Sequence, residues 1–524
     1  MARPLSFILV FFLAFSVILV SPASAKQKKL KAIDHYSNGC EFQGYGAFDK
    51  AIEEFKAAIK MEPTLKEAHF NLGLLYEVKK DWTLAEEEYQ TILKLDPAFV
   101  PVYNNLGLIY FQRNKPDKAL EYWQRGLRLD PNQPEVYNNV GILYMSQKDL
   151  DKAIQCFDAA ITLKPSYIEA ASNKAFAYMK KSDYKQAEEI YDKIVKDHSY
   201  DPVANYNFAL FYLNRASYKK AAEVLEKVLK IRSDFPEAHS YLAVALVHSG
   251  SLDRALQEAK LAKDLKPSPL IMGNLGFVYA SMERYPEAIT EYKSAIDKDS
   301  SVAEIWSNLG QAYIDQKQYD QAIEELQKGL ALHPGMDPLR LSLGQAYEEK
   351  GEYEKAAREY EMVAAQNQYL ATPYYHLGNL YFRENKLPQA LENYEKAVKR
   401  NSTYSEAYNN MGIISQRMGN QSQAIGYYDK AIAIEPQFVE AYNNLGLAYA
   451  EMKEWRNAIN SWMKGLSIDG SYADIYYNLG TVYEQMKQPV EAVKYYYQFL
   501  KLKPSLEDAA KVRKRIEHIE SQAQ

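Results

Sequence analysis

Residues 303–336 read AEIWSNLGQAYIDQKQYDQAIEELQKGLALHPGM, and this stretch carries the pattern that decides the fold. Around Gly310 the apolar and aromatic residues, among them Trp306 and Tyr313, are three or four positions apart. Residues at this spacing lie on one face of an α-helix. The same spacing resumes after a short break and stops at Pro334, because proline cannot continue a helix. The stretch therefore predicts two antiparallel helices, A and B, that pack through their apolar faces.

The same order of residues recurs along the chain with a fixed period. When Gly310 is numbered position 8 of its unit, twelve of the thirteen intervals between successive position 8 residues are 34 residues long and one is 33. Position 20 is alanine in every unit, and small residues at both positions let the two helices approach closely. The tyrosines at position 11 fill the space that is left, which explains why the chain has 44 of them. Position 8 is Gly39, Gly73, Gly107, Gly141, Ala175, Ala209, Ala243, Gly276, Gly310, Gly344, Gly378, Gly412, Gly446 and Gly480.

This pattern resembles the tetratricopeptide repeat, and the resemblance covers residues 32–506. It implies an all-α fold, a right-handed superhelical α-solenoid of fourteen helix pairs plus a C-terminal capping helix. One pair cannot bury its apolar face alone, so neighbouring pairs must share a continuous core. The residues that match the two halves of the family pattern are Trp306-x-x-Leu309-Gly310-x-x-Tyr313 and Ala153-x-x-x-Phe157 with Pro165.

The repeats define four segments of the chain. We expect a signal peptide at residues 1–25, repeats one to seven at 26–267, repeats eight to fourteen at 268–504, and a capping helix with a tail at 505–524. The division after 267 follows repeat seven, which is the weakest match and precedes the single short interval. The capping helix has one apolar face, made by Ala509, Val512, Ile516 and Ile519.

The first 25 residues have the features of a secretory signal peptide. A basic Arg3 is followed by an apolar run from Phe7 to Val20 and by small residues ending at Ala25. The apolar run is short for a membrane span, although an uncleaved anchor is the alternative. We therefore expect an exported protein, in a bacterial periplasm first of all, with an extracellular or an N-terminally anchored protein as alternatives.

The composition excludes several classes of protein. The chain has 524 residues, 63 basic and 68 acidic, for a formal net charge of −5. It has no basic surplus that would favour nucleic acid. No motif for phosphate, metal, cofactor or nucleophilic catalysis is present, and the repeats leave no room for a catalytic domain. Cys40 and Cys156 belong to units too far apart for a disulfide. We expect neither an enzyme nor a cofactor.

Asparagine is frequent at position 6 of helix A, which the resemblance places on the inner, concave groove. An asparagine side chain offers both a donor and an acceptor, so a row of them can hold the backbone of an extended peptide. The positions are similar to the asparagine ladder of the family's O-linked N-acetylglucosamine transferase branch. The alternative is that these side chains bond only within their own scaffold. They are Asn71, Asn105, Asn139, Asn173, Asn207, Asn274, Asn308, Asn410, Asn444 and Asn478.

Apolar residues at positions 9 and 12 form a stripe beside this row in the third to eighth repeats. A contiguous apolar stripe would suit an apolar peptide or one face of a partner helix. The alternative is that part of the stripe packs against the neighbouring unit. In repeats three to five the stripe consists of Leu108, Phe111, Ile142, Met145, Phe176 and Met179.

These observations predict a scaffold of the cell envelope that binds a protein or peptide partner along its groove, for assembly of a multiprotein complex. The family's carboxylate clamp for chaperone tails is not expected, because position 2 is mostly acidic. The alternative function is a structural or regulatory subunit of an envelope enzyme or secretion complex that acts through its convex surface or its termini. Neither nucleic acid nor, after signal cleavage, a membrane span is expected.

Overall fold

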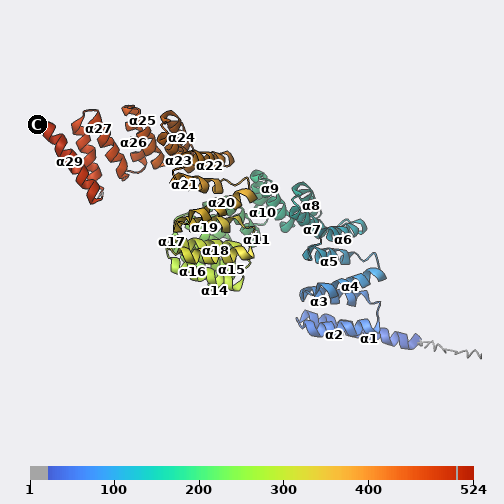
Figure 1. Ribbon diagram of the computed structural model, residues 1–524. Helices are drawn as coiled ribbons and strands as arrows, with labels where there is room; N and C mark the ends of the chain where they lie inside the picture. The colour runs from blue at the N-terminus through green and yellow to red at the C-terminus, as the bar shows by residue number, and fades with distance from the viewer. Residues whose placement is uncertain (1–21, 503–504, 524) are drawn as a thin grey trace, which may run out of the picture. The chain divides into compact units, whose positions relative to one another are not determined.

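The computed structural model describes residues 22–502 and 505–523 (Figure 1). Within these ranges the chain forms 29 α-helices and no β-strand. The prediction of an all-α solenoid with fourteen helix pairs and one further helix is confirmed. Of the expected signal peptide, residues 1–21 lie outside the described residues, and residues 22–25 begin α1 (Pro22–Gly44). Among the described helices, none is both long and apolar enough to cross a membrane.

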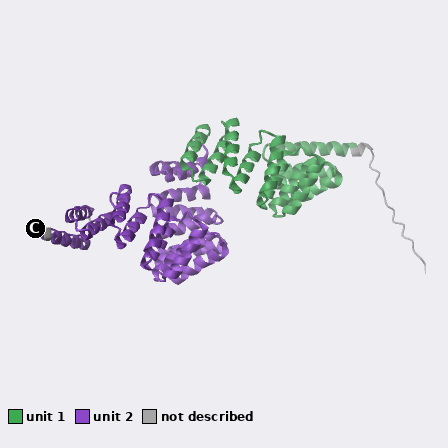
Figure 2. Cartoon of the chain, turned by 90° about the horizontal axis from the view of Figure 1, so that it is seen from above, with its two compact units in different colours: residues 1–233 green, residues 234–524 purple. Residues whose placement is uncertain are grey.

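The chain divides into two compact units between Ser233 and Asp234 (Figure 2). This boundary separates repeats one to six from repeats seven to fourteen, whereas the division expected after residue 267 falls one repeat later. In unit 1 the odd-numbered helices are the A helices and the even-numbered ones are the B helices. After α1 they are α2 (Phe48–Met61), α3 (Lys66–Val78), α4 (Trp82–Leu95), α5 (Val100–Gln112), α6 (Pro116–Leu129), α7 (Pro134–Ser146), α8 (Leu150–Leu163), α9 (Ile168–Lys180), α10 (Tyr184–Asp197), α11 (Pro202–Asn214) and α12 (Tyr218–Ile231).

Unit 2 continues the alternation of A and B helices and ends with a single helix. Its helices are α13 (Pro236–His248), α14 (Leu252–Leu265), α15 (Pro269–Ser281), α16 (Tyr285–Lys298), α17 (Ala303–Asp315), α18 (Tyr319–Leu332), α19 (Asp337–Lys350), α20 (Tyr353–Gln366), α21 (Thr372–Arg383), α22 (Leu387–Arg400), α23 (Ser405–Arg417), α24 (Gln421–Ile434), α25 (Val439–Glu451), α26 (Trp455–Ile468), α27 (Ala473–Gln485), α28 (Pro489–Lys501) and α29 (Leu506–Ala523).

Each helix pair closes by placing the position 24 side chain of helix B on the position 8 residue of helix A. Gly107 faces Trp123 in this way, and Gly344 faces Tyr360. A Cβ on any of the eleven position 8 glycines would come within 2.3 to 2.7 Å of that side chain. The glycine is therefore a packing requirement, because the large side chain uses the space that a methyl group would need.

The turn between the two helices of a pair has the same backbone in every repeat. The residue at position 15 adopts a left-handed conformation, with φ between 51° and 86°. Only four of these residues are glycine, so the turn holds ten ordinary side chains in a conformation that costs them energy. The ten are Lys80, Asn114, Lys148, Ser182, Ala216, Glu283, Lys317, Asn385, Lys453 and Lys487.

The last helix covers the end of the solenoid as predicted. Val512, Ile516 and Ile519 of α29 are buried and form one cluster with Tyr496 and Phe499 of α28. Within unit 2 each earlier pair contacts its successor, and α29 supplies the apolar surface that the final pair would otherwise leave open to water.

Candidate functional site

Several successive A helices contact one another and share one side of the helix pairs. In unit 1, α5 contacts α7, α7 contacts α9, and α9 contacts α11. We call the surface made by positions 2, 5, 6, 9, 12 and 13 of these helices the helix A face. It contains all the residues that the sequence predicts to bind a peptide.

The position 6 asparagines bond mainly to position 5 of the preceding A helix. Nδ2 of Asn139 donates to Oδ1 of Asn104 at 3.1 Å, and Nδ2 of Asn173 donates to Oδ1 of Asn138 at 2.9 Å. The same step recurs in unit 2, where Asn274 donates to Ser240 at 2.9 Å. Further steps of this hydrogen-bond ladder are Asn71 to Tyr36 at 3.4 Å, Asn444 to Asn409 at 3.0 Å and Asn478 to Asn443 at 2.9 Å.

Two asparagines bond elsewhere, and two others make no hydrogen bond among the described residues. Position 5 of the A helix before Asn105 is the apolar Phe70, which cannot accept a hydrogen bond from the amide. Asn105 donates instead to the Tyr89 hydroxyl, at 3.0 Å. Asn410 donates to Oδ1 of Asn379 at 3.4 Å and to the Tyr394 hydroxyl at 3.3 Å. The two without a bond are Asn207, which is half-buried, and Asn308, which is exposed.

The ladder changes what the asparagines can offer to a partner. Eight of the ten spend a donor on their own scaffold, as the scaffold interpretation of the sequence anticipated. Their Oδ1 atoms accept no hydrogen bond from the described parts of the chain, so they can still accept one from the N–H of a bound chain. The face is therefore a row of acceptors held in place by internal donors.

Two adjoining hollows lie on the helix A face of unit 1. One, of about 320 Å³, lies between α9 and α11 and is lined by Ser172, Asn173, Phe176, Met179, Tyr191, Asn207, Leu210, Phe211 and Asn214. The other, of about 560 Å³, lies between α7 and α9 and is lined by Ile142, Met145, Ser146, Lys148, Leu150, Phe176 and Lys180. Phe176 lines both hollows, so a chain that crosses its ring would enter each of them.

The predicted apolar stripe is only partly available to a partner. Phe176 is the most exposed member, at 41%, whereas Met179 is buried at 9%. Leu108 and Phe111 are half-buried and pack against the cluster around Trp123, and Ile142 and Met145 pack against the cluster around Phe157. Part of the stripe thus serves the core, and the part around Phe176 faces outward.

Sequence reasoning missed three groups of residues on this face. It did not assign the ladder acceptors at position 5, although Asn104, Asn138, Asn409 and Asn443 recur there. It did not single out Ser172 or Tyr191. The two lysines of the second hollow, Lys148 and Lys180, also went unnoticed because one belongs to a turn. The signal for Tyr191 was present, since repeat five combines a large residue at position 24 with alanine at position 8.

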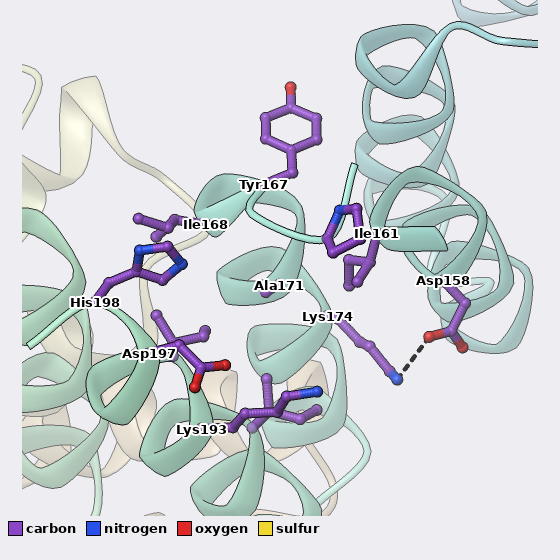
Figure 3. A pocket seen from close by; sticks show the side chains of 12 residues that line it. Asp158, Ile161, Tyr167, Ile168, Ala171, Lys174, Lys193, Asp197 and His198 are labelled. Atoms are coloured by element: carbon purple, nitrogen blue, oxygen red, sulfur yellow. Dashed lines mark ion pairs between the residues drawn. The ribbon is translucent and has the colours of Figure 1, made fainter. Parts of the chain in front are cut away.

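A third hollow uses a different side of α9. It measures about 130 Å³ and lies between the end of α8, the start of α9 and the end of α10, with Asp158 on one side and His198 on the other (Figure 3). Nζ of Lys174 and Oδ1 of Asp158 form an ion pair across its edge, at 2.6 Å. None of the predicted binding residues lines it.

Three histidines pair with glutamates of their own repeats, and the two cysteines form no disulfide. Cys40 and Cys156 are both free thiols. Nδ1 of His35, His69 and His239, all at position 4, faces a glutamate of helix B in the same repeat. Among the described residues no group of three or more side chains is arranged to hold a metal ion.

Models of tetratricopeptide repeats match most of the chain. Models described as "Tetratricopeptide repeat" match residues 36–98, 100–133, 134–167, 206–268, 314–377 and 473–506. A model described as "TPR repeat" matches residues 276–317, 378–419, 417–453 and 448–487. These ranges omit residues 168–205, which contain α9 and α10.

A solved structure shows the same fold. A chain in the crystal structure of the APC/C hetero-tetramer Cut9-Hcn1 is 16% identical, with a TM-score of 0.53, and the match covers 94% of this chain and 96% of that one. The crystal structure of MamA is 28% identical over 32% of this chain and 97% of that one, with a TM-score of 0.29. A search of curated proteins found no match.

Proposed function

Because this chain belongs to the tetratricopeptide-repeat family, we propose that it is a non-enzymatic scaffold that binds an extended peptide segment of a protein partner along its helix A face. The fold supports protein–protein interaction as the general role. The peptide mode and the surface are the specific parts of this proposal.

The observation that carries the proposal is the pair of hollows that meet at Phe176. Together they extend across three successive A helices, α7, α9 and α11, and combine apolar walls with unpaired acceptors. An extended peptide needs acceptors and donors for its backbone and pockets for alternate side chains. A partner helix satisfies its own backbone, so it would leave the row of Oδ1 acceptors unused.

The site of action that we propose is the cell envelope. The support is the sequence of residues 1–25, with its basic start, apolar run and small-residue end. A scaffold exported in this way would assemble a multiprotein complex outside the cytoplasm.

The competing function is a structural or regulatory subunit that uses its B helices or its termini. The hollow between α8 and α10 is the specific observation in its favour, because it offers Tyr167, Ile168 and His198 on a surface away from the helix A face. Its small size and the ion pair at its edge make it the weaker candidate.

A matched pair of substitutions distinguishes the two surfaces. Phe176→Glu places a charge between the hollows, and Leu163→Glu places one on a B helix at a residue that is almost equally exposed, 39% against 41%. Peptides are first selected from a random library displayed on phage, against the full-length protein. We expect Phe176→Glu to weaken their binding at least about tenfold and Leu163→Glu to leave it unchanged. The reverse pattern would favour the B-helix surface.

A further inference from the structure

The hydrogen-bond ladder of unit 1 has a step that stays open although both of its residues could bond. The step from α5 to α7 and the step from α7 to α9 are closed by the bonds of Asn139 and Asn173. The next step would join Asn207 of α11 to Ser172 of α9, and both residue types are able to bond. No such bond forms, and the Ser172 Oγ is buried without a partner. Ser172 itself is only 8% exposed.

A third polar group at the same place also lacks a partner. The position 24 tyrosines Tyr89, Tyr360 and Tyr496 each donate to a glutamate at position 12 of their own repeat. In repeat five, position 12 is Met179, which has no oxygen, and Tyr191 makes no hydrogen bond among the described residues. Ala175 replaces the usual glycine, so its methyl group takes the space in which the other tyrosine rings lie.

These groups all line the hollow between α9 and α11. Buried polar groups in folded proteins almost always have partners, and a group without one calls for an explanation. Here the unpaired groups are two hydroxyls and one amide, gathered beside an exposed aromatic ring.

We propose that the open step at Ser172, Tyr191 and Asn207 binds one backbone amide of an extended peptide that carries an apolar residue and, about three residues away, an acidic one. The proposal rests on the proposed function and identifies the kind of peptide that the helix A face selects.

The chemistry of a peptide amide matches the open step. Its carbonyl accepts from the Ser172 or Tyr191 hydroxyl, and its N–H donates to the Oδ1 of Asn207. The neighbouring apolar side chain enters the hollow between Phe176, Met179, Leu210 and Phe211. A single peptide amide thereby pairs with the hydroxyl and amide groups that the ladder leaves without partners.

The second hollow selects an acidic residue. Lys148 and Lys180 both line it, and none of its lining residues is acidic. The Lys180 ammonium lies 5.0 Å from the centre of the Phe176 ring, which lines both hollows. Neighbouring packed helices are roughly 8–10 Å apart and an extended chain rises about 3.3 Å per residue, so the two side chains are about three residues apart.

The test compares the open step with a closed one. The probe is a fluorescent blocked peptide of about twelve residues with leucine and, about three residues on, glutamate, titrated into the full-length protein. Ser172→Ala and Asn207→Ala are expected to weaken binding roughly two- to tenfold each, the effect of one lost hydrogen bond. Ser172→Ala should leave the thermal midpoint unchanged, because its Oγ has no partner in the free protein.

The control is Ser240→Ala, which removes the acceptor of Asn274 in unit 2. It should lower the thermal midpoint and leave peptide binding unchanged. If Ser172→Ala lowers the midpoint as Ser240→Ala does, the step is closed in solution and the proposal is wrong.

The charge preference gives an independent outcome. Exchanging the glutamate of the probe for lysine should weaken binding at least about tenfold, and the double variant Lys148→Glu, Lys180→Glu should reverse the preference. Binding that depends on Phe176 but is indifferent to Ser172, Asn207 and the probe's charge would overturn this inference while leaving the helix A face as the binding surface. Loss of the dependence on Phe176 would overturn the proposed function itself.

Discussion

A Cβ built on Gly446 would lie 2.3 Å from Nε1 of Trp462, the indole that fills the space between α25 and α26. The indole also donates to the Asn443 carbonyl of α25 at 3.1 Å, so a hydrogen bond as well as packing holds it against that helix. This relationship is repeated, with other large side chains, in each repeat that has glycine at position 8.

Gly446→Ala should therefore destabilise unit 2 by about 1–3 kcal/mol, the usual cost of overpacking a core. The matched control is Gly426→Ala in α24, where a new Cβ meets nothing within 4 Å. That change should stabilise the helix by about 0.5–1 kcal/mol, because alanine is the better helix former. Urea unfolding of both variants measures the difference, and equal effects would show that the close packing is absent in solution.

The ladder predicts coupling between two repeats. Nδ2 of Asn139 donates to Oδ1 of Asn104, so a double-mutant cycle with alanine at both positions should give a coupling energy of about 0.5–1.5 kcal/mol. Asn308→Ala is the control, since Asn308 is exposed and makes no hydrogen bond within the described ranges. Its stability should be unchanged. A coupling energy near zero for the first pair would mean that the asparagines are free to serve a ligand alone.

The sequence predicts the repeats well because the same packing problem is solved fourteen times. The period, the small residues at positions 8 and 20 and the final apolar face of α29 all concern contacts within one repeat or with its neighbour. Such contacts require the same types of residue at the same positions of each repeat. Fourteen helix pairs and a closing helix could therefore be predicted before any coordinates.

The details of the candidate site could be predicted only in part. Whether a position 6 asparagine binds a ligand or bonds within the scaffold depends on where its amide points. The residue type alone does not show that direction. The open step at Ser172 is less visible still, because serine and asparagine at these two positions would also permit a closed step. The unpaired hydroxyl of Tyr191 is easier to explain, because Met179 at position 12 offers no carboxylate.

His69 should make the stability of unit 1 depend on pH. Its Nδ1 faces Oε2 of Glu88 at 2.5 Å and its Nε2 faces the Pro63 carbonyl at 3.1 Å. Both partners can accept a hydrogen bond, so the two contacts favour the doubly protonated, charged ring. Burial lowers the pKa of His69, but the hydrogen bonds to Glu88 and Pro63 outweigh it, and the pKa lies above its ordinary value.

The sign follows from that raised pKa. The stabilisation is complete below the unfolded-state pKa of about 6.5 and is lost as the pH rises through the higher pKa of the folded state. His69→Tyr should reduce this dependence, because Tyr103 at the same position of the next repeat donates to the Pro97 carbonyl at 2.6 Å without titrating near neutral pH. Unfolding midpoints measured from pH 5 to pH 9 test it. A variant whose stability still falls as steeply as that of the parent would contradict the assignment.

Cys156 should react slowly in the native protein. Burial, with a smaller contribution from Asp149, raises the pKa of its thiol to about 11, so very little thiolate is present near pH 8. Alkylation by iodoacetamide at that pH should be at least about tenfold slower in the folded protein than in denaturant, because the thiolate is the nucleophile. Peptide mass spectrometry after timed quenching gives the two rates. Equal rates would show that α8 opens readily around this residue.

The last helix should control fraying of the C-terminal end. Ile516 is 4% exposed and packs in one cluster with Tyr496 and Phe499, so Ile516→Ala should remove about 2–5 kcal/mol of packing at that end. Repeats of a solenoid contact only their neighbours, so the loss should be felt locally before it is felt globally. Amide hydrogen exchange should therefore accelerate in α27 and α28 and stay unchanged in unit 1. The control is Lys514→Ala in the same helix, at an exposed residue, which should alter neither region. Uniform acceleration along the chain would mean that the end of the solenoid unfolds together with the rest.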